Sequence, residues 1–381
     1  MKIGIVIKNY AVGEIFDKSG MPNKSGAEFH AENHGKLFME KGHTVYLMTK
    51  KSHLLTRGRE TLNGLDVVRL HAPFRWLEST LRLYTTHKNT DAFYILGIPR
   101  FAVWIIKAAQ WQHKPTTLVL TSSVEIFDKE ENWRNRIFAQ CDNFIATSQE
   151  IADGLVQKTG IDRSRIHLIP HGIDATHRFY PAGPEEKAAL RQEMGLSPEK
   201  SVVLFCARVA PNKGVRVMLK AWRIIHKQRP DAQLLVVGGG LTTLLKEIKK
   251  VSRTEADNTI FVTGEVKKPD NYYRMSDIYI FPSEFEALPT TLLEAMGCGL
   301  PSVASDIGGC RDVILPGKTG FLAEKHDAAG FAEHILRLLD DKALREKMGA
   351  AARKLAVSKL DYQVIVNPLL DVITNKQKAE R

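Results

Sequence analysis

Two cationic side chains in the second half of the chain are suited to holding a phosphorylated ligand. Arg208 and Lys213 lie in a loop that follows a β-branched run ending at Cys206. A guanidinium can bind two phosphate oxygens at once, and a lysine adds a mobile point charge, so the pair suits a diphosphate leaving group. Cations in loops are more often solvent-exposed and idle, so this pair alone decides nothing.

Two carboxylates, Glu286 and Glu294, flank the start of a predicted helix. The run 278–281 predicts a strand, and Pro289 suits the first turn of the helix that follows it. The unpaired N–H groups of a helix N-terminus attract an anion or a polar sugar, and Glu286 stands ready to accept hydroxyl hydrogen bonds. Glu294 lies further along and can bind both vicinal hydroxyls of a ribose. Helices also carry glutamates on solvated faces, so the two carboxylates in isolation are weak evidence.

The elements that must position these residues alternate along the whole chain. Short β-branched runs are separated by longer amphipathic stretches, which is the pattern of parallel strands joined by crossover helices. Gly and Pro gather in 170–184, where we place a break between two Rossmann-like lobes. The predicted strands are 2–7, 44–48, 66–70, 92–96, 117–121, 143–147, 166–169, 202–206, 233–237, 259–262, 278–281 and 302–304.

Length and composition agree with a two-domain globular protein. The 381 residues exceed what one hydrophobic core usually supports, and no apolar run reaches the roughly 20 residues of a membrane span. The segment 1–7 is too short for a signal peptide, so we interpret it as a first strand and expect a cytoplasmic protein. The four cysteines form no C-x-x-C pair, which favours neither a zinc site nor a disulfide framework.

Positive charge is concentrated in the first half of the chain. Of the net charge of +11, residues 50–114 carry eleven Lys/Arg against four Asp/Glu. Aromatic and basic residues interleave in 74–88 and 100–114, which suits peripheral contact with an anionic membrane, although helices beside a Rossmann sheet need similar apolar stripes. No motif for binding nucleic acid accompanies the charge. The i, i+4 pair His30 and His34 indicates packing or acceptor contact rather than a metal site.

Taken together, the motifs resemble those of the GT4 family of glycosyltransferases. Glu286 and Glu294 meet that family's E-x7-E signature, in a segment from Pro282 to Pro301 that matches its pattern nearly throughout. The resemblance covers essentially the full chain. The other matching segments are Ser25-Gly26-Ala27-Glu28, residues 41–45, residues 146–148, residues 169–174, the loop of Arg208 and Lys213, Val237-Gly238-Gly239-Gly240 and residues 308–322.

This resemblance implies a fold, domain limits and a C-terminal helix. The fold is α/β of the GT-B type, in which two Rossmann-like doubly wound domains face a central cleft. We expect an acceptor domain over 1–175 and a nucleotide-sugar donor domain over 176–360. The C-terminal helix, 361–381, would pack back on the first domain.

The resemblance also assigns roles to individual residues. Arg208 and Lys213 would hold the donor diphosphate, and Glu294 the ribose. Glu286 would contact the donor sugar, so Glu286, Arg208 and Lys213 are the predicted catalytic residues. Gly26 would approach the diphosphate from the first domain, where a side chain would obstruct it. The remaining predicted donor contacts are backbone amides of Ala287, Leu288, Pro289 and Thr290 around the sugar, and Gly264 and Val266 beside the base.

Three departures from the family pattern stand out in the sequence. Ser25 replaces the first glycine of the Gly-Gly loop, and Ala287 and Pro289 replace the usual glycines, so a backbone donor is lost at Pro289. The family's histidine after a strand of the first domain is absent, with Ser123 in its place. Neither Tyr94 nor Leu96 supplies an obvious substitute.

The resemblance therefore implies a retaining, hexosyltransferase-type enzyme that moves a sugar from a nucleoside diphosphate sugar to a hydroxyl acceptor. The donor would be a UDP-, GDP- or ADP-sugar, with UDP favoured, and neither a metal nor another cofactor is expected. The acceptor would be a glycan or a lipid-linked intermediate of the cell envelope, met at the inner face of the plasma membrane. A nucleotide-sugar epimerase, a phosphorylase and a non-catalytic GT-B homologue remain as alternatives. A nicotinamide-dependent oxidoreductase is disfavoured because no strand is followed by G-x-G-x-x-G.

Overall fold

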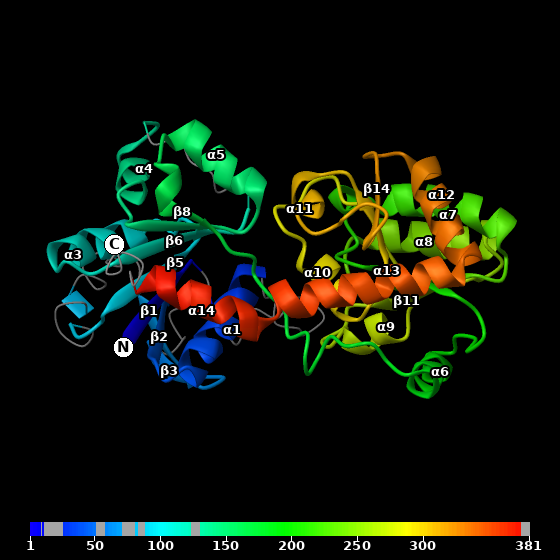
Figure 1. The fold of residues 1–381 in the computed structure, drawn as a ribbon, viewed down its shortest axis with the longest axis horizontal. Helices are drawn as coiled ribbons and strands as arrows, with labels where there is room; N and C mark the ends of the chain where they lie inside the picture. Colours follow the sequence, from blue (N-terminus) through cyan, green and yellow to red (C-terminus); the bar gives the residue numbers. More distant parts are fainter. Residues whose placement is uncertain are drawn as a thin grey trace. The chain divides into compact units, whose positions relative to one another are not determined.

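The chain forms two compact units, which are described separately here. The computed structural model describes residues 1–8, 10, 26–50, 58–70, 81–82, 88–122 and 130–374. One unit comprises Met1–His171 with Ile365–Arg381, and the other comprises Gly172–Val364 (Figure 1). The chain thus crosses between units twice, after His171 and after Val364.

The described strands of the first unit form one twisted sheet in the order β3-β4-β2-β1-β5-β6-β7-β8. All neighbours are parallel except the β3–β4 pair, which is antiparallel. The central strands are buried along nearly their whole length, as expected for a parallel sheet covered on both faces. The strands are β1 (Lys2–Ile7), β2 (Thr44–Lys50), β3 (Arg59–Leu62), β4 (Leu65–Leu70), β5 (Ala92–Leu96), β6 (Thr116–Leu120), β7 (Asn143–Ala146) and β8 (Ile166–Leu168).

Helices of the first unit begin and end where local chemistry dictates. Ser148 caps α5 by accepting the N–H of Ile151, and Gly160 ends that helix in the left-handed conformation. The last helix is tied to the sheet by a hydrogen bond from the Asn143 amide to the carbonyl of Val372 (3.0 Å). The helices are α1 (Gly26–Glu40), α3 (Ala102–Trp111), α4 (Trp133–Phe138), α5 (Gln149–Thr159) and α14 (Tyr362–Ile373), with the 3-10 turn η2 (Arg163–Arg165).

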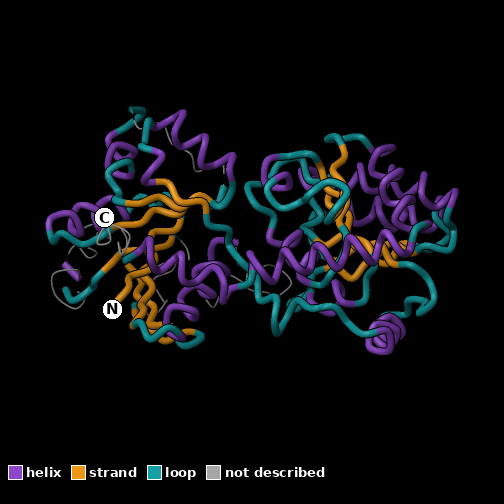
Figure 2. The backbone as a smooth tube through the Cα atoms, viewed as in Figure 1, coloured by secondary structure: helices purple, strands orange, loops and turns teal. Residues whose placement is uncertain are grey.

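The second unit contains a parallel sheet in the order β11-β10-β9-β12-β13-β14. Numbered within the unit, this is the order 3-2-1-4-5-6 of Rossmann domains. Figure 2 shows the strands of this unit gathered at its centre with helices around them. The strands are β9 (Val202–Cys206), β10 (Gln233–Val237), β11 (Ile260–Gly264), β12 (Ile278–Phe281), β13 (Ser302–Ser305) and β14 (Gly320–Ala323).

Two apolar clusters, one for each face of this sheet, make up its core. Trp222, Phe331 and their neighbours form one, while Tyr273, Tyr279 and Leu292 belong to the other. The helices are α6 (Pro184–Glu193), α7 (Val215–Gln228), α8 (Thr242–Glu255), α9 (Asp270–Arg274), α10 (Thr290–Gly297), α11 (Gly308–Arg311), α12 (Ala328–Asp340) and α13 (Lys342–Leu355), with η3 (Pro211–Lys213) and the π-helical η4 (Ala356–Leu360).

The predicted α/β class with two doubly wound units is confirmed. Each of the twelve predicted strands is present, within two residues at either end. The strands β3 and β14 were not predicted. Gly320–Ala323 reads GFLA, which is short and carries no β-branched residue, so its sequence gives little strand signal.

Candidate functional site

The order of strands in the second unit identifies the edge at which a ligand binds. The chain moves outward in one direction from β9 to β11 and in the other from β12 to β14, so the order reverses between β9 and β12. Ligands of open α/β sheets bind beyond the carboxyl ends of strands at such a switch point. The loops that leave these two strands carry Arg208 and Lys213 on one side and Glu286 on the other.

The two loops are held tightly against each other. Gly214 has a φ of +69°, and a Cβ there would lie 1.8 Å from the carbonyl oxygen of Pro282, so glycine is required on both counts. The Glu284 N–H donates to the carbonyl of Asn212 (3.0 Å), and the Ser283 hydroxyl lies 3.1 Å from the same oxygen. The position of Lys213 relative to Glu286 is therefore fixed by backbone contacts.

The charged side chains at this edge divide into a pair and a lone cation. Lys213 forms an ion pair with Glu286, and each side chain is about one-fifth exposed. The Ser283 hydroxyl lies 3.2 Å from the same carboxylate and helps to orient it. Arg208 is exposed, and no hydrogen bond or ion pair joins it to another described residue. Sequence reasoning found all three charges but not Ser283, whose role depends on the fold of the loop.

The start of α10 lies in the same loop region. Pro289 is the N-cap of this helix and Thr290 its first residue, so the prediction that Pro289 occupies the first helical turn was one position off. Neither Ala287 nor Leu288 donates a backbone hydrogen bond to another described residue. Gly309 of α11 packs against the loop that precedes α10. A Cβ at Gly309 would lie 2.0 Å from the carbonyl oxygen of Ala287.

Glu294 lies deeper, in the second turn of α10, and is only 7% exposed. Burial raises the pKa of its carboxyl to about 7; Asp270 adds to the rise, while Tyr273 and Arg178 oppose it. The carboxylate thus sits among aromatic and thiol side chains at a cost in solvation. An acid kept in such a place without a full counter-charge is a candidate for function.

The other predicted donor contacts lie at the end of β11 in the second unit and at the start of α1 in the first. Gly264 ends β11, and its carbonyl accepts the N–H of Gly238 (2.9 Å), while Val266 is half-buried just beyond. These residues lie at the same carboxyl edge of the sheet as Arg208. Gly26 begins α1 in the first unit. Its approach to the diphosphate stays a prediction, as do the roles of the other site residues and the cleft between the lobes.

Three histidines of the first unit, His30, His34 and His171, form a buried cluster. His34 lies 2.8 Å from the Tyr94 hydroxyl through Nδ1 and 3.0 Å from the carbonyl oxygen of His171 through Nε2, so Nε2 carries the proton. The ring of His30 stacks on that of His171 at 3.9 Å. Within the described residues, no group of three or more metal-ligating side chains is present. Ser123 lies outside the described residues, and its effect stays a prediction.

The aromatic and basic segment of the first unit is only partly described. Most of 74–88 lies outside the described residues. On α3, Phe101 and Ile105 face the core, whereas Trp104 and Trp111 are 38% and 72% exposed. Lys107 is exposed on the same helix, and Trp133 of α4 lies beside Trp104. No described helix is both long and apolar enough to cross a membrane.

Solved structures of glycosyltransferases share this fold. The chain matches the Anabaena protein Alr3699/HepE, crystallised in complex with UDP, with a TM-score of 0.80 and 20% identity over 98% of this chain and 100% of that one. It matches sucrose-phosphate synthase from Thermosynechococcus elongatus with a TM-score of 0.77 and 19% identity over 99% of each chain. The predicted GT-B fold class is thereby confirmed.

Sequence comparison agrees in both halves of the chain. The family model "Glycosyltransferase Family 4" matches residues 24–177, and "Glycosyl transferases group 1" matches residues 186–355. The D-inositol 3-phosphate glycosyltransferase of Pseudarthrobacter chlorophenolicus is 31% identical over 77% of this chain and 72% of its own length. A GDP-mannose-dependent monoacylated alpha-(1-6)-phosphatidylinositol monomannoside mannosyltransferase of Corynebacterium glutamicum is 30% identical over 55% of this chain. The match spans 56% of that relative's length. The chain belongs to the GT4 family of glycosyltransferases.

Proposed function

We propose that this protein transfers a glycosyl unit from a nucleoside diphosphate sugar to a hydroxyl acceptor, with retention of the anomeric configuration. The observation that carries the proposal is the set of charges at the switch point of the second unit. Arg208 is exposed without a partner among the described residues, and Lys213 is paired with the partly exposed Glu286 carboxylate. Their position at the switch point of a Rossmann-like sheet supports the proposal that they hold the donor diphosphate.

The chemistry follows from the change of charge on the diphosphate. As the bond to the sugar breaks, the departing diphosphate gains negative charge, which Arg208 and Lys213 stabilise more strongly than they stabilise the bound donor. When Lys213 turns to the phosphates, Glu286 is released to accept a hydrogen bond from a sugar hydroxyl. The N–H groups of Ala287 and Leu288 are available beside it. The acceptor hydroxyl can then pass its proton to the departing phosphate, without a protein nucleophile.

The relatives suggest a class of donor and a class of acceptor. A UDP-sugar is our first choice, which fits the HepE complexes with UDP and with UDP-glucose. A GDP-sugar is the alternative suggested by the Corynebacterium relative. That relative's name also describes a lipid-linked acceptor, and the exposed Trp104 and Trp111 of α3 would suit contact with a membrane that carries one.

A panel of UDP-, GDP- and ADP-sugars tests the proposal, with nucleotide release as the readout and glycan and lipid acceptors added in turn. Arg208→Ala and Lys213→Ala should each lower kcat/KM by on the order of 10², because each removes one charge from the leaving group. Lys220→Ala, an exposed lysine on α7, is the matched control and should leave the rate unchanged.

Three outcomes would contradict the proposal. Wild-type rates in both Arg208→Ala and Lys213→Ala would remove the diphosphate assignment. Conversion of one sugar nucleotide into another without an acceptor would favour an epimerase. Binding of nucleoside diphosphates without turnover of any donor would favour a non-catalytic homologue.

A further inference from the structure

A second cavity lies at the opposite edge of the same sheet. It has a volume of about 310 Å³ and is bordered by the residues that precede β12 and β13, by α6 and by the first turn of α13. These are the amino ends of the strands, whereas the candidate donor site lies at their carboxyl ends. The volume is within the range of about 300–1,000 Å³ that is usual for small-molecule sites.

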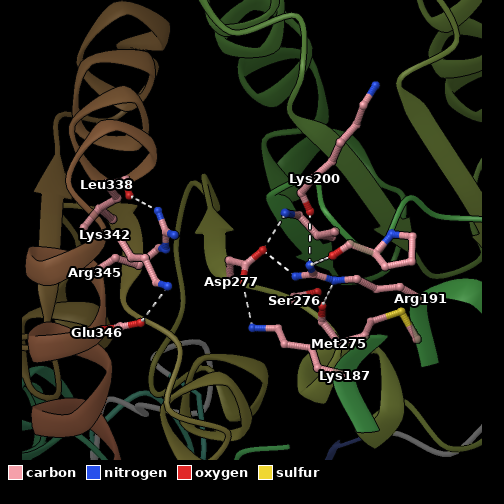
Figure 3. Close-up of polar contacts among 12 residues, drawn as sticks. Lys187, Arg191, Lys200, Met275, Ser276, Asp277, Leu338, Lys342, Arg345 and Glu346 are labelled. Atoms are coloured by element: carbon pink, nitrogen blue, oxygen red, sulfur yellow. Dashed lines mark hydrogen bonds and ion pairs between the residues drawn. The ribbon is translucent and has the colours of Figure 1, made fainter. Parts of the chain in front are cut away.

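The wall of this cavity is rich in cations, as Figure 3 shows for most of them. Lys187, Arg274, Lys342 and Arg345 line it, against the two carboxylates of Asp277 and Glu346. Arg274 is balanced from outside the wall by its ion pair with Glu186. Lys342 lies 3.8 Å from Glu346, an exposed and therefore weak pair.

Both carboxylate oxygens of Asp277 already accept hydrogen bonds, from two cations and a backbone N–H. Its Oδ1 accepts from Lys187 Nζ at 2.7 Å, and its Oδ2 accepts from Arg191 at 2.5 Å and from the Val202 N–H at 2.7 Å. One carboxylate thus serves two cations. Burial by itself would raise the pKa of Asp277, but Lys187 and Arg191 outweigh it and hold that pKa below its usual value. Asp277 therefore has no charge to offer Arg345.

Arg345 lines the cavity, and one edge of its guanidinium makes no hydrogen bond to the described residues. Its Nη1 donates to the carbonyl oxygens of Leu338 (2.6 Å) and Leu339 (3.3 Å), which fixes the guanidinium plane. Its Nε and Nη2 donate to none of the described residues. Arg59 and Arg229 use this same edge to bind carboxylates with two hydrogen bonds each. Arginine binds phosphate oxygens through this same edge, also with two parallel hydrogen bonds.

Adding these charges leaves two cations without a carboxylate, Arg345 and one of the two that share Asp277. The positive charges of this group interact. The pKa of Lys187 is lowered mainly by burial and also by the charges of Arg191 and Arg345, while Asp277 acts to raise it. A phosphate monoester carries roughly −1.5 to −2 charges at neutral pH, which matches this surplus. A carboxylate would neutralise only half of it.

We propose that this cavity, named here the amino-edge pocket, binds a small molecule that carries a phosphate group. The phosphate would lie between the Nε and Nη2 edge of Arg345 and the ammonium groups of Lys187 and Lys342. The rest of the ligand would occupy the part of the cavity bordered by Leu300 and Pro301. Cys298 and Gly299, which directly follow α10, also line the pocket, so its occupant touches the end of the helix that carries Glu294.

Calorimetric titration of the full chain with inorganic phosphate tests the proposal. Arg345→Lys keeps the charge but removes the two-bond edge, and Lys342→Gln removes an exposed charge without risk to the fold. Each should raise the Kd for phosphate on the order of tenfold, the typical effect of losing a charge-assisted hydrogen bond. Lys347→Gln, an exposed lysine on the same helix that does not line the pocket, should leave the Kd unchanged.

Two further arms separate this pocket from the donor site and from a general anion site. Phosphate binding that persists in Arg208→Ala belongs to the amino-edge pocket, whereas binding lost in Arg208→Ala and kept in Lys342→Gln would overturn the proposal. Acetate at equal ionic strength should bind at least tenfold more weakly than phosphate; equal affinity would overturn the phosphate assignment. Absence of any phosphate binding would do so as well. None of these outcomes depends on whether the protein transfers a sugar.

Discussion

Replacement of Glu294 by Gln should make the second unit more stable while it weakens donor binding. The side chain is 7% exposed, and its carboxyl has a pKa raised from 4.5 to about 7, mainly by burial. The folded protein therefore holds the proton more tightly than the unfolded chain does. Gln has nearly the same shape and can accept hydrogen bonds, but it carries no charge to bury.

The size of the effect and its pH window follow from that shift. A raised carboxyl pKa means that the folded state binds more protons than the unfolded state between pH 4.5 and about 7. The stability of the wild type therefore falls as the pH rises through this window, and above it the charged carboxylate costs about 3 kcal/mol, at roughly 1.4 kcal/mol per pKa unit. Glu294→Gln should recover up to this amount at pH 8 and almost nothing at pH 4.5.

Urea denaturation of the wild type and Glu294→Gln at pH 5 and pH 8 measures the gain. Glu333→Gln, which removes an exposed carboxylate from α12, is the control and should show no such gain. The same Glu294→Gln protein should bind UDP less tightly, because a neutral amide accepts ribose hydroxyls less strongly than a carboxylate does. A gain that is equal at both pH values, or no gain at pH 8, would refute the reasoning from burial; unchanged UDP affinity would refute the ribose role.

Four other perturbations test separate parts of the molecule. Glu286→Gln should tighten UDP binding severalfold, because Lys213 loses its competing carboxylate, yet lower the rate of transfer; weaker UDP binding in a calorimetric titration would contradict this. Gly309→Ala should lower kcat/KM by on the order of tenfold or more, since its Cβ would meet the Ala287 carbonyl oxygen at 2.0 Å, whereas Gly183→Ala, with open space around it, should leave kcat/KM unchanged. The pKa of His34 is lowered from 6.5 to about 4 by burial, so its contribution to the stability of the first unit is present above pH 6.5 and lost as the pH falls toward 4; a flat urea midpoint across that range would contradict it. Trp111→Ala should reduce sedimentation of the protein with vesicles that contain anionic lipid, and equal sedimentation would remove α3 from any membrane contact.

The fold and the charged residues at the switch point could be predicted because they leave strong local signals. Alternation of β-branched runs with amphipathic stretches gives parallel strands, and two cations after the strand that ends at Cys206 must then lie at a carboxyl edge. The roles predicted for Glu286 and Glu294 needed the resemblance to the GT4 pattern as well, because the two carboxylates in isolation are weak evidence. If the strand order of a Rossmann domain is assumed, the order of strands along the chain gives β10 and β12 as the neighbours of β9.

Long-range contacts could not be predicted in the same way. The ion pair of Lys213 with Glu286 joins residues that are 73 positions apart, and it depends on how two loops fold together at Gly214. The pKa of Glu294 is lowered in part by Tyr273, which comes from a different helix, α9. The amino-edge pocket assembles α6, α13 and two strand starts, and only residues 298–301 of its lining belong to the segment that resembles the family pattern. Such features arise from tertiary packing between distant segments, which local sequence propensity does not report.

In the proposed donor site of the free protein, Glu286 neutralises one of the two cations, Lys213, and this pairing would affect selectivity. Lys213 already has an ion partner in Glu286, so a ligand gains from Lys213 only the difference between its own phosphate and that carboxylate. A doubly charged diphosphate carries more negative charge than Glu286 and can displace that carboxylate from Lys213. A singly charged anion gains no free energy by doing so. Displacement in turn frees Glu286 for a hydroxyl, which only a diphosphate with an attached sugar provides. The ion pair would therefore disfavour simple anions. A ligand would engage both Lys213 and Glu286 only if it carried a diphosphate and an attached sugar.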